Sequence, residues 1–237
     1  MFSGQGSHYY HMGLEMFEQH PTFKKWMLDL NEIASDMLGE SVLTKLYDKT
    51  KSKSDLFDQT RYSHPAIFML EYALVQVLLE DGIEPYYVLG TSMGEFACAA
   101  VAGILPVDEA LKALIKQAQV LETHCQKGGM TAIVNKTTLF NDLPQLFNDS
   151  ELASVNFHSH FVVSGKPESL QDIENFLQKK NIVYQRLPVS IGFHSGLIEP
   201  AMPIYMDFLK QKTYQLAKIP FISCACADKL DLIPALW

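Results

Sequence analysis

The chain has 237 residues, of which 48% are hydrophobic and 19% are charged, and its formal net charge is −8. A chain of this length and composition can bury a full core, as one large domain or as a core carrying a smaller subdomain. The acidic balance excludes a general nucleic-acid-binding surface, because phosphate binding relies on clustered Lys and Arg side chains.

Membrane insertion and metal binding are also disfavoured by the sequence. Apolar stretches such as Ala66–Leu79 fall short of the roughly 20 residues that a bilayer crossing needs, and no secretory signal is evident. The four cysteines follow no common zinc spacing: Cys98, Cys125, Cys224 and Cys226. We therefore expect a cytoplasmic protein with reduced thiols, without a metal ion, and without a nucleic-acid or membrane partner.

The first block of the chain, residues 1–126, alternates short apolar strands with long helices, which is typical of a parallel sheet covered by helices. Residues Ala66–Glu80 are apolar on most sides and predict a buried helix, and Asp108–Cys125 predicts a second one. Between them, Tyr86–Leu89 is typical of a buried strand. Residues 189–237 are expected to return to this large subdomain.

The second block, residues 127–188, predicts a separate small subdomain. Its pattern changes to the order strand, helix, strand, strand, helix, strand, which is the ferredoxin-like arrangement. The predicted elements are strands at 130–134, 152–156, 161–164 and 182–187, and helices at 138–147 and 167–180.

The strand Tyr86–Leu89 runs directly into Gly90-Thr91-Ser92-Met93-Gly94. A strand followed by Gly-x-Ser-x-Gly and a helix places the serine on a sharp turn, with its Oγ clear of the backbone. We expect Ser92 to be the nucleophile that forms an acyl-enzyme. The backbone N–H of Met93, at the start of the next helix, is the expected first donor of an oxyanion hole.

A second oxyanion donor is expected from the loop Ser3-Gly4-Gln5-Gly6-Ser7, with Gln5 as the candidate. The two glycines allow the tight backbone that aims an N–H group at a site. The alternative is that Gly4 and Gly6 only shape a strand-to-helix turn.

His194 is the expected base for Ser92, since histidine has a pKa near neutrality. It follows a Gly-Phe pair in an apolar segment after the serine, where a Ser-first hydrolase order places the base. The acids between these two residues lie in the small subdomain, so we expect a Ser-His dyad whose imidazole is oriented by a backbone carbonyl. Other histidines are predicted to be exposed, helical or in a hairpin loop: His8, His11, His20, His124, His158 and His160.

Together these motifs resemble the malonyl-CoA:acyl carrier protein transacylase family, which includes the acyltransferases of fatty-acid and polyketide synthases. The resemblance runs almost end to end, from within what would be the family's first strand to a point short of its usual last strand and helix. It rests on Gly4-Gln5-Gly6-Ser7, Ser63-His64-Pro65-Ala66, Gly90-Thr91-Ser92-Met93-Gly94-Glu95, Asn156 with Val162-Val163-Ser164-Gly165, and Gly192-Phe193-His194-Ser195.

The resemblance implies an α/β fold, with an α/β-hydrolase-like core around a parallel sheet and an inserted ferredoxin-like α+β subdomain. It also implies a ping-pong reaction, in which Ser92 takes the acyl group from an acyl-CoA or acyl-carrier thioester. The phosphopantetheine thiol of an acyl carrier protein, or water, then removes that group. Family members bind no metal and no redox cofactor, so phosphopantetheine and CoA are expected only as substrate carriers.

The sequence departs from the family at the position that binds the free carboxylate of malonyl groups. Family members that use malonyl have an arginine 25 residues after the serine, where this chain has Gln117. A buried carboxylate left without that partner costs roughly 2 to 5 kcal/mol, so a neutral acyl chain is expected instead of malonyl. Alternatively, Gln117 is only a helix-surface glutamine. Thr91 and His64 also replace usual residues, and with Asn156 and Phe193 they are expected at the substrate site.

Three functions remain open from the sequence. The first is an acyltransferase that loads a non-carboxylated acyl group onto a carrier protein in polyketide or fatty-acid biosynthesis. The second is a thioesterase, or acyl hydrolase, that clears stalled acyl groups from carrier proteins through the same acyl-enzyme. The third is a non-catalytic carrier-binding scaffold, which the joint retention of Ser92, His194 and Gln5 disfavours.

Overall fold

The computed structural model describes residues 1–224 and 228–230, so Cys226 lies outside the described residues. The chain divides into two compact units, the first comprising Met1–Gln119 with Met206–Trp237 and the second Val120–Tyr205. Within the described residues, every helix is too short or too polar to cross a membrane.

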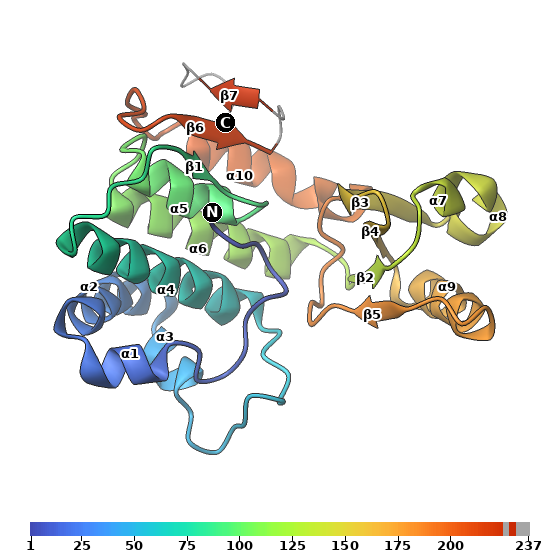
Figure 1. Cartoon of the computed structure of the whole chain (residues 1–237), viewed down its shortest axis with the longest axis horizontal. Helices are drawn as coiled ribbons and strands as arrows, with labels where there is room; N and C mark the ends of the chain where they lie inside the picture. Colours follow the sequence, from blue (N-terminus) through green and yellow to red (C-terminus); the bar gives the residue numbers. More distant parts are fainter. Residues whose placement is uncertain (225–227, 231–237) are drawn as a thin grey trace. The chain divides into compact units, whose positions relative to one another are not determined.

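The first unit begins with four helices: α1 (Leu14–Gln19), α2 (Pro21–Leu38), α3 (Val42–Leu46) and α4 (Thr60–Glu80). Helix α2 has Pro21 in its first turn, where the missing N–H costs no helical bond, and it buries Phe23, Met27 and Leu30 at helical spacing. Helix α4 packs against both α2 and α3 (Figure 1). These helices supply one side of the unit's apolar core.

Helix α4 begins at Thr60, six residues before the predicted start at Ala66, and it runs through Pro65. The prediction placed the start too late because a proline usually opens a helix rather than interrupting it. Pro65 removes one helical hydrogen bond, and the burial of Tyr62 and Phe68 on either side of it offsets this cost.

The sheet of the first unit has the strand order β1-β6-β7, with β1 at Val88–Leu89, β6 at Phe221–Ser223 and β7 at Asp228–Leu230. Strands β1 and β6 are parallel, and Phe2 adds a parallel bridge to Gly90. Strand β1 begins two residues later than predicted, where its pairing with β6 begins. Helix α5 (Gly94–Val101) contacts both β1 and β6.

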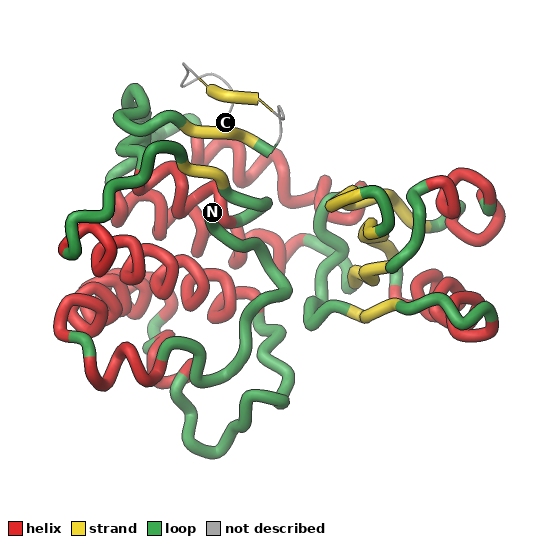
Figure 2. The backbone as a smooth tube through the Cα atoms, in the orientation of Figure 1, coloured by secondary structure: helices red, strands yellow, loops and turns green. Residues whose placement is uncertain are grey.

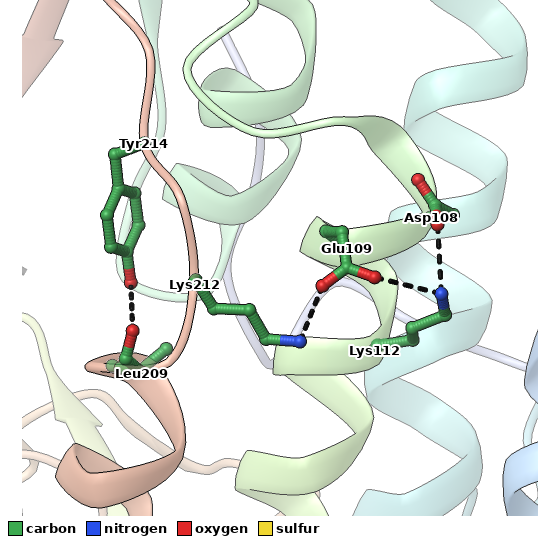
Figure 3. Close-up of polar contacts among 6 residues, drawn as sticks. All are labelled: Asp108, Glu109, Lys112, Leu209, Lys212 and Tyr214. Atoms are coloured by element: carbon green, nitrogen blue, oxygen red, sulfur yellow. Dashed lines mark hydrogen bonds and ion pairs between the residues drawn. The ribbon is translucent and has the colours of Figure 1, made fainter.

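The start of α6 (Val107–His124) is tied to the segment that follows α10 (Met202–Leu209) by an ion-pair network (Figure 3). Lys212 Nζ lies 2.5 Å from one oxygen of the Glu109 carboxylate, and Lys112 Nζ lies 2.9 Å from the other. The Lys212 side chain is only 13% exposed, so water screens its ion pair less than it screens surface pairs. The helix predicted at 108–125 is confirmed to within one residue at each end.

The second unit contains an antiparallel sheet with the strand order β3-β4-β2-β5. Its chain order and sheet order are those of a ferredoxin-like subdomain. In this unit Val120, Leu121, Ile191 and Ala201 pack into one apolar cluster with the sheet. The elements are β2 (Gly129–Ile133), α7 (Thr138–Asp142), α8 (Pro144–Phe147), β3 (Ser150–Phe157), β4 (His160–Gly165), α9 (Pro167–Lys179) and β5 (Tyr184–Arg186).

Helices α7, α8 and α9 lie on one side of this sheet, as Figure 2 shows, and Phe147, Leu170 and Ile173 pack there against Phe161 of β4. The single helix predicted at 138–147 is instead two helices. Pro144 disfavours the helical region for the residue before it, and Leu143 accordingly has φ −125° and ψ 58°.

Candidate active site

Ser92 lies on a sharp turn between β1 and α5, with a left-handed φ of 55°. That angle is uncommon and strained for a residue with a side chain, and it is typical of a nucleophile held on a Gly-x-Ser-x-Gly turn. Hydrogen bonds from the N–H groups of Gly94 and Glu95 close the turn, each 3.0 Å long. A Cβ at Gly90 would lie 2.3 Å from the Gly94 backbone, so glycine is required there.

Met93 is the residue immediately before α5, with its side chain buried. The first N–H groups of a helix have no intrahelical acceptor and lie at the positive end of the helix dipole. The closing bonds of the turn begin at the N–H of Gly94, so the Met93 N–H precedes them. Met93 therefore stays the candidate for the first oxyanion donor.

The loop Gly4-Gln5-Gly6 lies directly against this turn. A Cβ at Gly4 would lie 2.7 Å from the Thr91 carbonyl oxygen and 3.3 Å from Ser92 Cβ, an approach that only glycine allows. The Gln5 side chain donates from Nε2 to Ser63 Oγ at 3.3 Å. The first unit thus brings together the serine and the loop from which the second oxyanion donor was predicted.

Two titratable side chains hold the ends of this loop, and neither role was predicted from the sequence. Ser3 donates from its N–H and its Oγ to Glu71 Oε1, at 2.5 and 2.8 Å, and burial raises the pKa of Glu71 to about 7. At the other end, the Gly6 N–H donates to His8 Nδ1 at 3.3 Å. The prediction that His8 is exposed or helical was wrong, because Phe57, distant in sequence, covers it and leaves it 7% exposed.

The other residues expected at the substrate site of this unit differ in exposure. Thr91 is exposed beside Ser92, and Gln117 is half-buried on α6. His64 is buried in α4, and this burial lowers the pKa of its imidazole to about 3, so the ring is neutral at physiological pH.

His194 belongs to the second unit, in a turn that leads into the 3-10 helix η1 (Gly196–Ala201), and its φ is 58°. Its side chain is exposed, yet partial desolvation by the surrounding protein lowers the pKa of the imidazole below 6.5. Ser195 holds the turn, because its Oγ donates to the Gly192 carbonyl at 2.7 Å and accepts from the Leu197 N–H at 3.4 Å. At pH 7 the imidazole is neutral, as a general base must be.

The remaining two candidates also lie in the second unit. Phe193 is buried in the apolar cluster that includes Ile191, which gives it a packing role. Asn156, on β3, donates from Nδ2 to His160 Nδ1 at 2.7 Å and accepts from Ser154 Oγ at 2.6 Å. We expect the backbone carbonyl that orients His194 to come from the C-terminal region, of which residues 225–227 and 231–237 lie outside the described part.

A cavity of about 660 Å³ opens in the first unit beside α4, lined mostly by apolar side chains together with Ser3 and Glu71. Ser92 is not among its lining residues, so we do not place an acyl chain there. Among residues 1–224 and 228–230, no group of three or more His, Cys, Asp and Glu side chains is arranged to hold a metal ion.

A serine on a strained turn between a parallel strand and a helix, in an α/β fold with a ferredoxin-like subdomain, is typical of proteins built around a nucleophile elbow. The model of the acyl transferase domain family matches residues 1–232. The chain belongs to this family, which confirms the resemblance inferred from the motifs.

Comparison with known proteins gives the same family. The chain is 48% identical to the polyketide biosynthesis acyltransferase homolog PksD of Bacillus subtilis (strain 168), over 98% of this chain and 72% of that protein. Malonyl CoA-acyl carrier protein transacylase from Burkholderia pseudomallei is 27% identical, with a TM-score of 0.83 over 97% of this chain and 77% of that one. The acyltransferase domain from the second module of the salinomycin polyketide synthase has the same TM-score and identity, over 98% of this chain and 54% of its own. This chain thus spans about half of that structure.

Proposed function

We propose that this protein is an acyltransferase of polyketide biosynthesis that works through an acyl ester on Ser92. The observation that carries the proposal is the strained φ of 55° at Ser92, two residues before the start of α5. Membership of the acyl transferase family and 48% identity to PksD support the same class. In this proposal residues 127–188 form the inserted subdomain, and residues 1–126 with 189–237 carry the nucleophile and its base.

In the proposed first half-reaction, Ser92 Oγ attacks the carbonyl carbon of an acyl thioester while its proton passes to the His194 imidazole. The oxyanion that forms accepts hydrogen bonds from the N–H groups of Met93 and Gln5. Collapse of this intermediate breaks the carbon–sulfur bond, and the departing thiolate takes the proton from His194. The second half-reaction reverses these steps with the phosphopantetheine thiol of an acyl carrier protein.

The proposed acyl group carries no free carboxylate. Gln117 is half-buried on α6 and offers only a neutral amide, which cannot form the charge-assisted pair that an arginine makes with malonyl. Acetyl and longer neutral chains lose nothing at this position. We therefore expect acyl-CoA or acyl-carrier thioesters of neutral acids as donors.

An acyl-carrier-protein thioesterase is the second candidate, because Gln117 suits it equally well. Such an enzyme forms the same ester on Ser92 and transfers the acyl group to water. A hydrolase that clears stalled carriers must accept many neutral chains, which a carboxylate-binding arginine would not favour.

Purified protein mixed with acetyl, hexanoyl and malonyl thioesters, sampled over time by intact-protein mass spectrometry, tests both the substrate and the acceptor. We expect neutral acyl masses to appear at least tenfold faster than malonyl, and Gln117→Arg to narrow this ratio. Gln19→Arg, which adds the same charge at an exposed position of α1, should leave the ratio unchanged. Malonyl labelling faster than acetyl in the wild type would contradict the substrate assignment.

The acceptor follows from the decay of the acyl mass in the same experiment. An ester that persists in buffer and discharges on adding carrier protein indicates transfer. An ester that decays at the same rate with or without the carrier indicates hydrolysis and removes the transferase proposal.

A further inference from the structure

His8 bridges two loops of the first unit through both nitrogens of its ring. Its Nε2 lies 2.7 Å from the Phe57 carbonyl oxygen, and its Nδ1 lies 3.3 Å from the Gly6 nitrogen. A carbonyl oxygen can only accept a hydrogen bond, so Nε2 carries the hydrogen and donates it. Nδ1 then has a lone pair, which accepts the Gly6 N–H. The two contacts together require the neutral imidazole in one tautomer.

The surroundings of His8 hold the ring in this state. The Phe57 ring packs edge-on against it, with 5.9 Å between the ring centroids, and Tyr10 stacks on Phe57 with 4.6 Å between their centroids. Burial lowers the pKa of His8 below 6.5. The titratable groups facing it among the described residues are Asp58, which acts to raise that pKa, and His64 on α4, which is itself neutral.

The loop that His8 holds has little rigidity of its own. Two of its three residues are glycines, and glycine loses more conformational freedom on ordering than any other residue. Gly4 nevertheless lies in tight contact with Thr91 and Ser92. An oxyanion donor must be held within about 0.5 Å of its working position by its supporting contacts, and the bond from Gly6 to the buried His8 is such a contact.

We propose that His8 is a positioning residue, which fixes the Gly4-Gln5-Gly6 backbone so that the Gln5 N–H meets the oxyanion formed at Ser92. This inference deepens the proposed function and rests on it. His8 touches neither the substrate nor Ser92 in this role; it acts through the loop.

Protonation of His8 undoes the bridge. A proton on Nδ1 turns the acceptor of the Gly6 N–H into a second donor, and two donors facing each other repel. Acylation of Ser92 must then fall in acid for two reasons, because His194 also has to be neutral to accept a proton. The wild-type rate should fall by up to 100-fold per pH unit below both pKa values, the mark of two protonations.

The test compares His8→Ala, His8→Gln and the control His11→Asn in single-turnover acylation of Ser92, followed from pH 4 to 8. His11 contacts the Lys51 carbonyl at 2.7 Å, in the same loop before α4 that contains Phe57. Asparagine tolerates the φ of 65° at position 11. Glutamine has an acceptor for Gly6 and a donor for Phe57, so it can restore both bonds without titrating.

We expect His8→Ala to lower the maximal acylation rate about 10- to 100-fold. The substrate concentration that gives half the maximal rate should stay within threefold of the wild-type value. His8→Gln should recover most of the acylation rate, and its rate should fall only tenfold per pH unit in acid. His11→Asn should acylate as the wild type does. Any of three results would overturn the inference. The first is a wild-type acylation rate in His8→Ala, and the second is an equal loss of rate in His8→Ala and His11→Asn. The third is the same acid slope of the rate in wild type and His8→Gln. If His8→Ala fails to fold, the acid slopes of wild type and His8→Gln decide it. Failure of the wild type itself to acquire an acyl mass would refute the proposed function, and the role of His8 with it.

Discussion

Replacing Gly4 with alanine is predicted to slow the acylation of Ser92, because the new side chain pushes the Gln5 loop away from the serine. The added Cβ would lie 2.7 Å from the Thr91 carbonyl oxygen, whereas ordinary van der Waals contact begins at 3.4 Å. The loop or the turn must therefore shift by about 0.7 Å. A misplacement of about 1 Å costs on the order of 100-fold in rate, so we expect a loss of about 10- to 100-fold.

The assay is single-turnover acylation at saturating thioester, quenched in acid and read by intact-protein mass, with circular dichroism to establish that the variant is folded. Gly39→Ala is the matched control. A Cβ at Gly39 meets nothing within 4 Å, and its φ of 73° costs about 1 kcal/mol of strain, so stability falls while acylation stays within twofold. A folded Gly4→Ala protein that acylates at the wild-type rate would show that the close approach of Gly4 to Thr91 does not position the oxyanion donor.

Two further predictions concern stability. The pKa of Glu71 is raised from 4.5 to about 7 in the folded state. Between these pH values the folded protein binds a proton that the unfolded chain releases. The free energy of unfolding therefore falls by up to about 3 kcal/mol as the pH rises through this range. Glu71→Gln should remove this slope in urea unfolding at pH 5 and 7.5, and parallel slopes would contradict it. Lys212→Ala should destabilise the protein by about 1 to 3 kcal/mol, because it breaks a largely buried pair with Glu109. Lys210→Ala, which breaks an exposed pair, should cost about 0 to 0.5 kcal/mol, and equal effects in thermal unfolding would count against the role given to burial.

The parts of the site that depend on local sequence could be predicted from it. The turn at Ser92 needs small neighbours and a strand leading into it, and both are visible in Gly90-Thr91-Ser92-Met93-Gly94. The ferredoxin-like order of strands and helices in the second unit could also be predicted, because strands and helices differ in the spacing of their hydrophobic residues.

The parts that depend on distant contacts could not be predicted. His8 stands in a polar, glycine-containing stretch, and nothing near it in sequence indicates that Phe57 covers it. Glu71 is one polar position in an apolar helix, and its bond to Ser3 spans 68 residues. The early start of α4 was missed for the same reason, since tertiary burial around Pro65 overrides the local preference of a proline.

Whether Ser92 carries the acyl group is settled by locating that group after the protein reacts with a neutral acyl thioester. Wild-type protein and Ser92→Ala are each incubated with acetyl and hexanoyl thioesters, digested, and analysed by tandem mass spectrometry. We expect one acyl mass on the peptide that contains Ser92 in the wild type and none in the variant. The same acyl mass in Ser92→Ala, or a label on another residue of the wild type at comparable rate, would contradict it.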